Sequence, residues 1–239
     1  MARPTKTEAR EDTRGELIEA AWRLFSTEGY DATPVEAILD MVGLSKGTFY
    51  YYFSGKEDIL DAVVSRIVED MAKDIKDIPN MNDLSPMQKM NRFMETTSSW
   101  KLSNIDIISE TIKVLYRDEN AIILRKMNMR TLREFAPTLA EIIRQGIEDG
   151  AFDVEYPRDA AEMILLLSRA MGDQQAEDML LLEEDPGSMQ RIVRRVRLYL
   201  DTFERILGAP RGSIFTLDDA RVEEFEQALK GEGVRENGS

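Results

Sequence analysis

The stretch LFSTEGYDATPVEAILDMVGLSKGTFYYYFSGKEDIL, residues 24–60, decides the fold of this chain. An amphipathic helix begins upstream of this stretch and ends at Gly29. A second helix follows over about residues 35–42 and is closed by Gly43. A third short helix begins at Ser45. Because only the tight turn of residues 42–45 joins the second helix to the third, the stretch predicts a helix-turn-helix.

Helical spacing divides the third helix, residues 45–53, into two faces. Phe49 and Phe53 lie four residues apart and are predicted to pack on the first two helices. The opposite face carries a cation, two phenols, a hydroxyl and a glycine that permits close approach: Lys46, Tyr50, Tyr51, Thr48 and Gly47. These are the groups that a protein uses to contact phosphates and base edges in a major groove.

Three capping boxes predict where helices begin. They pair Thr33 with Glu36, Ser54 with Glu57, and Ser85 with Gln88. The free N–H groups at such helix starts favour anions, and Lys56 adds a positive charge to the second of them. Thr33 and Ser45 could serve as caps only, or could also donate to a phosphate.

The composition excludes several classes of protein. The chain has 239 residues, of which 43% are hydrophobic, and it contains neither cysteine nor histidine. Disulfides, thiolate and imidazole metal sites and Ser–His–Asp catalysis are therefore excluded, and we expect neither an enzyme nor a cofactor. No apolar run could span a membrane and the N-terminus is unlike a secretory signal, so we expect a soluble, cytoplasmic protein with no membrane partner.

The charge balance limits how the chain could bind nucleic acid. Its net charge is −14, and its first 66 residues carry eight Lys or Arg against twelve Asp or Glu. This balance argues against indiscriminate binding, but it leaves room for a small basic patch. Lysines 46 and 56, with Arg14 and the arginines before it, would have to lie on one edge of the N-terminal region.

The rest of the chain is predicted to be helical, which makes the fold class all-α with about nine or ten helices. We expect helices over about residues 55–77, 85–100, 104–117, 120–149 with an interruption at Pro137, 157–182, 187–207 and 216–230, followed by a frayed tail. The predicted division is a helix-turn-helix domain over 1–55, a connecting helix and boundary over 56–80, and a larger helical domain over 81–239.

The stretch quoted above resembles the DNA-binding signature of the TetR family of bacterial transcriptional repressors. The matching positions run from Leu24 to Glu57 and include Gly29-Tyr30, Thr33, Gly43-Leu44-Ser45, Gly47-Thr48-Phe49-Tyr50 and Lys56. Met41 departs from the pattern, where the family usually has a small residue. The resemblance covers about residues 14–68, less than a third of the chain.

The resemblance implies a homodimer that binds a palindromic, double-stranded operator with residues 45–52 of each subunit in a major groove. By the family pattern, Thr33, Ser45, Tyr50 and Lys56 would hold phosphates. Lys46, Gly47, Thr48 and Tyr51 would lie nearest the bases, and Tyr52 could do either. The larger domain would bind a small-molecule effector that releases the operator.

By the resemblance, the dimer would form through the helices near 157–182 and 187–207. The first is apolar around most of the helix at residues 163–167, and the second carries apolar residues at helical spacing: Ile192, Val196, Tyr199, Leu200, Phe203 and Leu207. The alternative is that these faces form the core of a single chain. An effector pocket is predicted from adaptable thioethers, large residues with polar tips and one arginine: Met90, Met94, Met129, Trp100, Tyr116 and Arg169. Ordinary core packing and an ion pair from Arg169 to Asp173 or Glu162 are the alternatives.

Two further hypotheses remain open for the larger domain. It could bind a protein instead of a small molecule, with the DNA-binding head unchanged. It could also be an enzyme that uses carboxylates on helices, such as Glu141 and Glu148 or Asp173, Glu177 and Asp178. The absence of histidine disfavours this second hypothesis, since the usual di-metal sites of helical proteins need a Glu-x-x-His motif.

Overall fold

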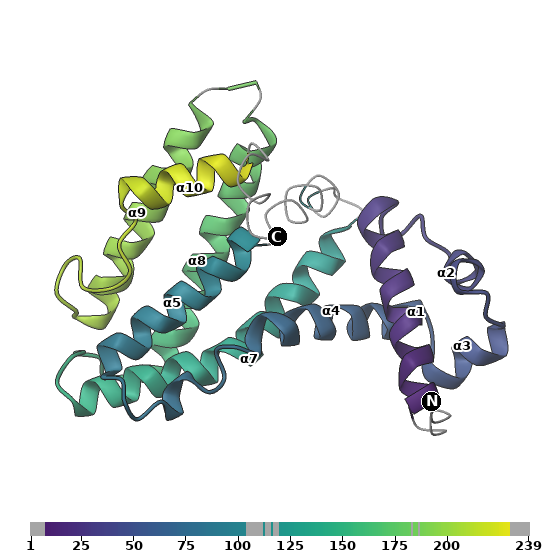
Figure 1. Cartoon of the computed structure of the whole chain (residues 1–239), viewed down its shortest axis with the longest axis horizontal. Helices are drawn as coiled ribbons and strands as arrows, with labels where there is room; N and C mark the ends of the chain where they lie inside the picture. Colours follow the sequence, from purple (N-terminus) through teal and green to yellow (C-terminus); the bar gives the residue numbers. More distant parts are fainter. Residues whose placement is uncertain are drawn as a thin grey trace, which may run out of the picture. The chain divides into compact units, whose positions relative to one another are not determined.

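The structure is a computed structural model that describes residues 8–103, 112, 116, 120–182, 184–185 and 187–229. Every element in these ranges is helical (Figure 1), so the predicted all-α fold is confirmed. The elements are α1 (Glu8–Thr27), α2 (Val35–Val42), α3 (Lys46–Tyr52), α4 (Lys56–Ala72), the 3-10 helix η1 (Ile78–Asn80), α5 (Pro86–Ser103), α7 (Ala121–Glu148), α8 (Pro157–Leu180), α9 (Ser188–Leu207) and α10 (Asp219–Leu229). The helix predicted over 104–117 and the tail predicted after 230 lie outside the described residues, apart from single positions. Among the helices described, none is long and apolar enough to cross a membrane.

The described residues form two compact units, and each unit consists of two separate segments of the sequence. The first unit takes in the ranges Met1–Val68 and Lys113–Arg130, and the second takes in Glu69–Ile112 and Thr131–Ser239. Helices α4 and α7 each begin in the first unit and end in the second. The beginning of α7 thus belongs with the helix-turn-helix, although it lies far from it in the sequence.

The core of the first unit holds the two helix-turn-helix elements on α1. Phe25 of α1, Ile38 of α2 and Phe49 of α3 are fully buried, and Phe53 is nearly so. The predicted orientation of Phe49 and Phe53 is therefore confirmed. The chain leaves α2 through Gly43, whose φ of 68° lies in the left-handed region that favours glycine.

The predicted capping boxes have different outcomes at α5 and α4. At α5, Gln88 N donates to Ser85 Oγ at 3.3 Å and Ser85 N donates to Gln88 Oε1 at 2.9 Å, as predicted. At α4, the N–H of Ser54 donates instead to Asp58 Oδ2 at 2.8 Å. The prediction for Glu57 is wrong because this carboxylate pairs with Lys126, 3.1 Å away, which comes from a distant part of the chain.

Pro137 does not interrupt α7, contrary to our prediction. A proline within a helix removes the hydrogen bond to the carbonyl four residues earlier, which here belongs to Arg133. Both residues are exposed, so water can satisfy that carbonyl and the helix continues. A proline at a buried position would have had no such compensation.

In the second unit, α9 packs its apolar face on α8 within the same chain. The buried residues of this face include Ile192, Leu200, Phe203 and Leu207. The intrachain alternative therefore holds for these side chains, and the dimer through the two helices stays a prediction. The side chains that remain exposed on the two helices are different ones.

Asp178 has a structural role at the far end of the same helix pair. It is buried, and its carboxylate accepts from Arg191 Nε at 2.6 Å and from Arg195. Two arginines of α9 thus neutralise one acid of α8, which is how a buried carboxylate is normally tolerated. This pairing removes Asp178 from the carboxylates that an enzyme could use.

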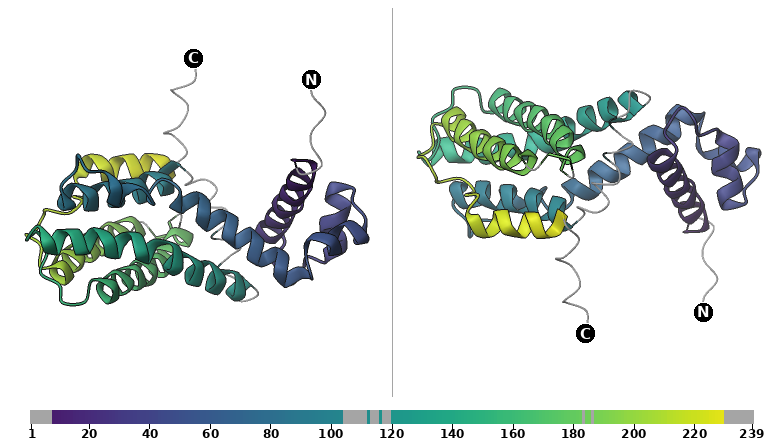
Figure 2. Two further views of the ribbon diagram at one scale, coloured as in Figure 1. Left: turned by 90° about the horizontal axis from the view of Figure 1, so that it is seen from below. Right: turned by 90° about the horizontal axis from the view of Figure 1, so that it is seen from above.

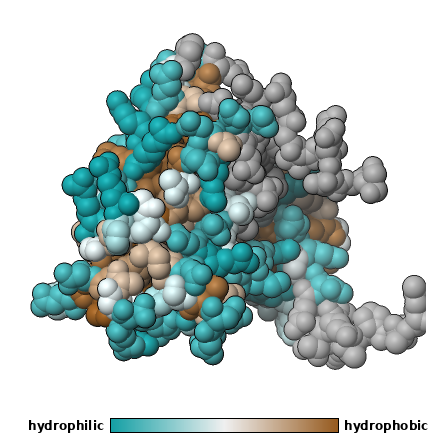
Figure 3. Space-filling view, turned by 60° about the vertical axis from the view of Figure 1, so that its left-hand side comes forward, coloured by the Kyte–Doolittle hydropathy of each residue, from teal (hydrophilic) through white to brown (hydrophobic). Residues whose placement is uncertain are grey.

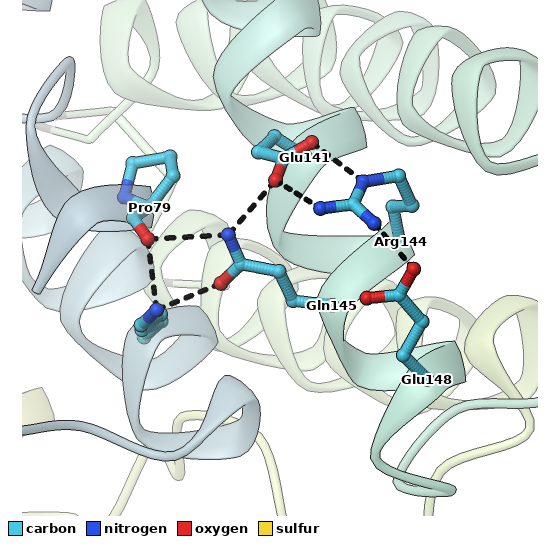
Figure 4. Close-up of polar contacts among 6 residues, drawn as sticks. Pro79, Glu141, Arg144, Gln145 and Glu148 are labelled. Carbon is cyan, nitrogen blue, oxygen red and sulfur yellow. Dashed lines mark hydrogen bonds and ion pairs between the residues drawn. The ribbon is translucent and has the colours of Figure 1, made fainter. Parts of the chain in front are cut away.

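A buried lysine joins η1, α5 and α7 within the second unit. Lys89 Nζ donates to Pro79 O at 2.8 Å and to Gln145 Oε1 at 2.7 Å. Gln145 in turn donates to Glu141, which Arg144 holds from its other side (Figure 4). The guanidinium of Arg144 is the main reason that the pKa of Glu141 is lowered to about 2.

We expect Glu141→Gln to reduce the change in the free energy of unfolding between pH 7 and pH 3. The pKa of Glu141 is below its ordinary value, so its contribution is present above pH 4.5 and is lost as pH falls towards 2. Because the side chain is partly exposed, we expect a loss of about 1 kcal/mol or less at pH 7. Urea unfolding, followed by circular dichroism at pH 7, 5 and 3, measures it. The more exposed Glu148→Gln, on the same arginine, is the control.

The C-terminal helix α10 lies along α5 (Figure 2), and Arg221 of α10 pairs with Glu95 of α5 at 3.7 Å. The segment before it is held by two side chains. Asn91 of α5 accepts from Phe215 N at 2.7 Å and donates to Ser213 O at 3.1 Å. The buried Glu204 accepts from the N–H groups of residues 212 and 214. The contacts of Asn91 join positions more than a hundred residues apart, so no local sequence pattern predicts them.

Candidate nucleic-acid interface

Ser45 caps the third helix as its sequence predicts. It has extended backbone angles, and its Oγ accepts from the N–H of Thr48 at 3.2 Å. The two hydroxyls also hydrogen-bond to each other at 3.0 Å. Capping fixes the beginning of α3, and it leaves the Thr48 hydroxyl at the first turn of the helix, beside Ser45.

The face of α3 opposite Phe49 is open to solvent. Tyr50 is 59% exposed and Tyr51 is 62% exposed, which is unusual for side chains of this size. A Cβ added to Gly47 would meet only Ser45 Oγ, at an ordinary distance of 3.7 Å. Tyr50 packs edge to face on Phe49, and Tyr51 packs edge to face on Tyr52, yet more than half of each phenol is open to solvent and the glycine is not required by a close contact.

Lys46, at the beginning of this face, forms an ion pair with Glu36 of α2. Its Nζ lies 2.6 Å from Glu36 Oε1, and both side chains are more than half exposed. A hydrogen bond from Lys46 lowers the pKa of Glu36, and the same bond raises the pKa of Lys46. The predicted capping box of Glu36 with Thr33 does not form, and the structure records Pro34 at the cap position of α2 with no side-chain hydrogen bond.

Thr33 is fully buried, and its hydroxyl donates to Gly29 O at 2.7 Å. This side chain closes the loop between α1 and α2 and turns away from solvent. The prediction that it contacts a phosphate finds no accessible hydroxyl here. The placement favours a positioning role, in which Thr33 holds the loop that leads into α2.

Lys56, the first residue of α4, packs its ammonium group against the loop that Thr33 closes. Its Nζ lies 4.4 Å from the centre of the Tyr30 ring and donates to Asp31 O at 3.3 Å. Partial burial lowers the pKa of Lys56, while Asp31 opposes this effect. The Tyr30 ring packs at 5.2 Å, edge to face, on Phe25 of the core. The position of the Lys56 ammonium thus depends on how the loop is held.

Asn120, which sequence reasoning missed, also holds the loop between α1 and α2, through its side chain. Its side chain is fully buried, and Oδ1 accepts from the N–H of Tyr30 at 2.7 Å. The carboxamide also lies against Gly29, whose φ is 94°. A few residues later, Lys126 pairs with Asp61 of α4 at 2.6 Å. No sequence signal identifies either residue, because their contacts lie some 65–90 residues away.

Arg14 is a further cation of the head. Its guanidinium carbon lies 5.3 Å from the centre of the Phe53 ring, which is the residue that ends α3. Arg14 therefore lies near the end of α3 opposite to Lys46. The sequence places it among the arginines that could reach a phosphate, and its position in the structure is compatible with this role.

The structure places the predicted effector residues in both of its units. Met90 and Met94 are buried in the core of the second unit, which is the core-packing alternative. Met129 is half-exposed and belongs to the first unit. Tyr116 is half-buried, also in the first unit, and the side chain of Trp100 lies outside the described ones.

Arg169, which we predicted as part of an effector pocket, is not buried. Its side chain is about half exposed, and its Nε lies 3.8 Å from Asp173 Oδ2, one helical turn along α8. The apolar run before it, residues 163–167, is itself partly exposed, so this part of α8 is not enclosed by the chain. The ion-pair alternative therefore describes Arg169.

Family models match both parts of the chain. Residues 17–63 match the model of bacterial regulatory proteins of the tetR family, and residues 104–180 match a tetracyclin repressor-like C-terminal domain. The first match covers the helix-turn-helix, and the second covers all of α7 and α8. Together they span more than half of the chain.

The chain is also similar to several known regulators. It is 25% identical to the transcriptional repressor KstR2 of Rhodococcus jostii over 65% of the chain and 79% of the relative. It is 27% identical to the probable regulator ArpR of Pseudomonas putida over 72% of the chain and 84% of the relative. The fold matches a complex of SmeT with triclosan at a TM-score of 0.62 and 20% identity, over 87% of this chain and 96% of that one; SmeT is a repressor from Stenotrophomonas maltophilia. The chain therefore belongs to the TetR family and is a DNA-binding transcriptional regulator.

Proposed function

We propose that the protein is a repressor that binds a palindromic operator as a homodimer and leaves it when a small molecule binds the second unit. The observation that carries the proposal is the open face of α3, with two exposed tyrosines and a glycine that packing does not require. In a helix-turn-helix, this face is the one that enters the major groove.

The proposed contacts are those that the resemblance to the family implies. Lys46, Gly47, Thr48 and Tyr51 approach base edges, while Ser45, Tyr50 and Lys56 approach phosphates. Thr33 keeps a positioning role, because its hydroxyl is used inside the head. Phosphate contacts would set affinity and salt dependence, and base contacts would set the preferred sequence.

We expect Gly47→Ala to stabilise the head and yet weaken DNA binding. Alanine favours a helix over glycine by up to about 1 kcal/mol, and the added Cβ meets nothing close inside the protein. The same Cβ would obstruct the DNA, so we expect operator affinity to fall at least about tenfold, which corresponds to about 1.4 kcal/mol. Thermal melting and fluorescence anisotropy measure the two effects.

Gly172→Ala is the matched control for this change. Gly172 lies inside α8, where an added Cβ would meet nothing within 4 Å. It should raise stability in the same way and leave DNA affinity unchanged. If Gly47→Ala binds DNA as well as the unchanged protein does, then α3 does not approach DNA as proposed.

Selection of bound duplexes from a random DNA pool tests the proposed function directly. We expect a palindrome to be enriched, with two subunits or a multiple of two bound to each duplex. Combined Lys46→Ala and Tyr50→Ala substitutions should then abolish most of the specific binding and reduce the salt slope. Unchanged affinity and slope in this double variant would contradict the assignment of the interface.

The proposed dimer surface consists of exposed apolar side chains on α8 and α9. They are Met163, Leu166, Leu167 and Leu198. The Tyr199 hydroxyl donates to Ile164 O at 3.5 Å, so Leu198 lies at the level of the first half of α8. Figure 3 shows hydrophobic side chains that interrupt a mostly hydrophilic surface. Two copies of the helix pair would form a four-helix bundle.

The effector is proposed by analogy with relatives, and its binding residues are left open. SmeT has been solved with triclosan, which is a small aromatic molecule, and the fold match supports a similar arrangement here. The alternative is regulation by a protein partner. Thermal shift of the full chain with a panel of small aromatic compounds, followed by release of the selected duplex, distinguishes the two: a ligand that stabilises the protein and releases DNA supports the proposal, and its absence favours a protein partner.

A further inference from the structure

The ion pair of Glu36 with Lys46 joins the first turns of the two helices of the helix-turn-helix. Glu36 is the second residue of α2 and Lys46 is the first residue of α3. Their charged atoms lie 2.6 Å apart, and the side chains are 55% and 65% exposed. The cation at the beginning of the recognition helix thus has an acidic partner on the protein before DNA arrives.

This acid lies where DNA would bring its own negative charge. The first helix of a helix-turn-helix crosses the DNA backbone, while the beginning of the second helix reaches base edges. The N–H groups at a helix start favour a phosphate, and Glu36 adds a carboxylate to the start of α2. Phosphates that approach this surface must therefore tolerate a nearby carboxylate, and Lys46 must leave Glu36 to meet them.

We infer that Glu36 is a specificity-determining residue, which reduces binding to non-operator DNA by withholding Lys46 from phosphates. This inference rests on the proposed function, in which Lys46 contacts DNA. On non-operator DNA, Lys46 would exchange one anionic oxygen for another and gain little. On the operator, a guanine offers two acceptors, O6 and N7, to the ammonium. Because an ammonium has three N–H donors, Lys46 can contact the base without leaving Glu36.

The strength of the pair suits such a role. An exposed ion pair adds a modest stabilisation, and the contact that Lys46 loses on leaving Glu36 offsets most of what one phosphate contact would add. The other lysine of the interface, Lys56, is also engaged within the protein, on Asp31 O and the Tyr30 ring. The first 66 residues carry more acids than bases, which further weakens the attraction to DNA of arbitrary sequence.

Glu36→Gln tests the inference, because glutamine keeps the shape of the side chain and removes its charge. Affinity is measured by fluorescence anisotropy over a series of salt concentrations, for two duplexes of equal length and composition. One is the duplex selected by the unchanged protein, and the other is its scrambled sequence. We expect affinity for the scrambled duplex to rise about three- to tenfold, with a salt slope steeper by about one, as for one additional phosphate contact. Affinity for the selected duplex should rise less than twofold.

Two further variants separate this role from a general effect of charge. Glu162→Gln removes the same charge from an exposed ion pair with Arg158 in the second unit, and it should change neither affinity. In a Lys46→Met background, Glu36→Gln should lose most of its effect, since the acid acts through that lysine. Circular dichroism of each variant verifies the fold.

Three results would overturn the inference. The first is lower affinity for the selected duplex with no change for the scrambled one, which would mean that Glu36 accepts a hydrogen bond from a base. The second is no change for either duplex, and the third is an undiminished effect in the Lys46→Met background. If the unchanged protein selects no duplex, the operator proposal fails, and the scrambled duplex alone still tests whether Glu36 withholds Lys46.

Discussion

Replacing both Leu166 and Leu198 with arginine is expected to convert the protein into a monomer and to weaken operator binding at least about a hundredfold. Leu198 is 64% exposed and Leu166 is 46% exposed, so arginine fits at both positions without disturbing the core of the chain. In a symmetric dimer each substitution occurs twice. Four positive charges would then be forced into one apolar interface, where burying an unpaired charge is costly.

The effect on DNA binding follows from the loss of one of two linked contacts. A dimer that holds one half-site has its second head near the other half-site, which raises the effective concentration of that head. Linkage of this kind commonly increases affinity by about 10²–10⁴-fold. A monomer keeps the contacts of a single head and loses this increase entirely.

Light scattering after size-exclusion chromatography gives the mass, and anisotropy with the selected duplex gives the affinity. Leu181→Arg is the control, because it adds the same charge at another exposed leucine. Leu181 lies fifteen residues after Leu166, which corresponds to about 22 Å along a helix. A double variant that remains a dimer of unchanged affinity would place the subunit contact elsewhere.

The sequence predicted most of what depends on neighbours along the chain. The two faces of α3 follow from the spacing of Phe49 and Phe53, and the cap at Ser45 follows from its position before the helix. Both features arise within one or two helical turns, where periodicity and capping preferences apply. For the same reason the pair of Ser85 with Gln88 was predictable.

Competition from distant groups explains what the sequence did not reveal. Glu36 and Glu57 stand where capping boxes are expected, but Lys46 and Lys126 attract their carboxylates instead. A capping contact is worth about 1 kcal/mol, so a nearby lysine is enough to displace it. The same limit applies to α9, whose apolar pattern cannot distinguish burial on α8 from burial on a second subunit.

Asn120→Ala is expected to weaken operator binding about tenfold, although Asn120 itself would not touch DNA. Its carboxamide accepts from the N–H of Tyr30 in the buried part of the loop between α1 and α2. Alanine leaves that N–H without its acceptor, which costs about 1–3 kcal/mol. The loop can recover this cost only by moving towards water, and Lys56, which lies on the Tyr30 ring, would then lose its position.

Hydrogen exchange in the segment around Tyr30 measures the first step, and anisotropy with the selected duplex measures the second. We expect the Tyr30 amide to exchange faster in the variant, because exchange follows local opening. The apparent affinity is proportional to the fraction of molecules whose loop remains in the binding geometry, so it falls as that fraction falls. Faster exchange with unchanged affinity would separate the loop from the DNA contact and would contradict the positioning role of Asn120.

Asn91→Ala provides a closely matched control for this experiment. Asn91 also accepts a backbone N–H at 2.7 Å, that of Phe215, but it does so in the second unit. Both variants remove one carboxamide that joins distant parts of the chain, so their losses of stability should be similar. Only Asn120→Ala should reduce operator affinity, because only its loop contacts Lys56, the lysine proposed to hold a phosphate. Equal losses of affinity in the two variants would mean that DNA binding follows overall stability, and that the Asn120 contact has no particular place in the interface.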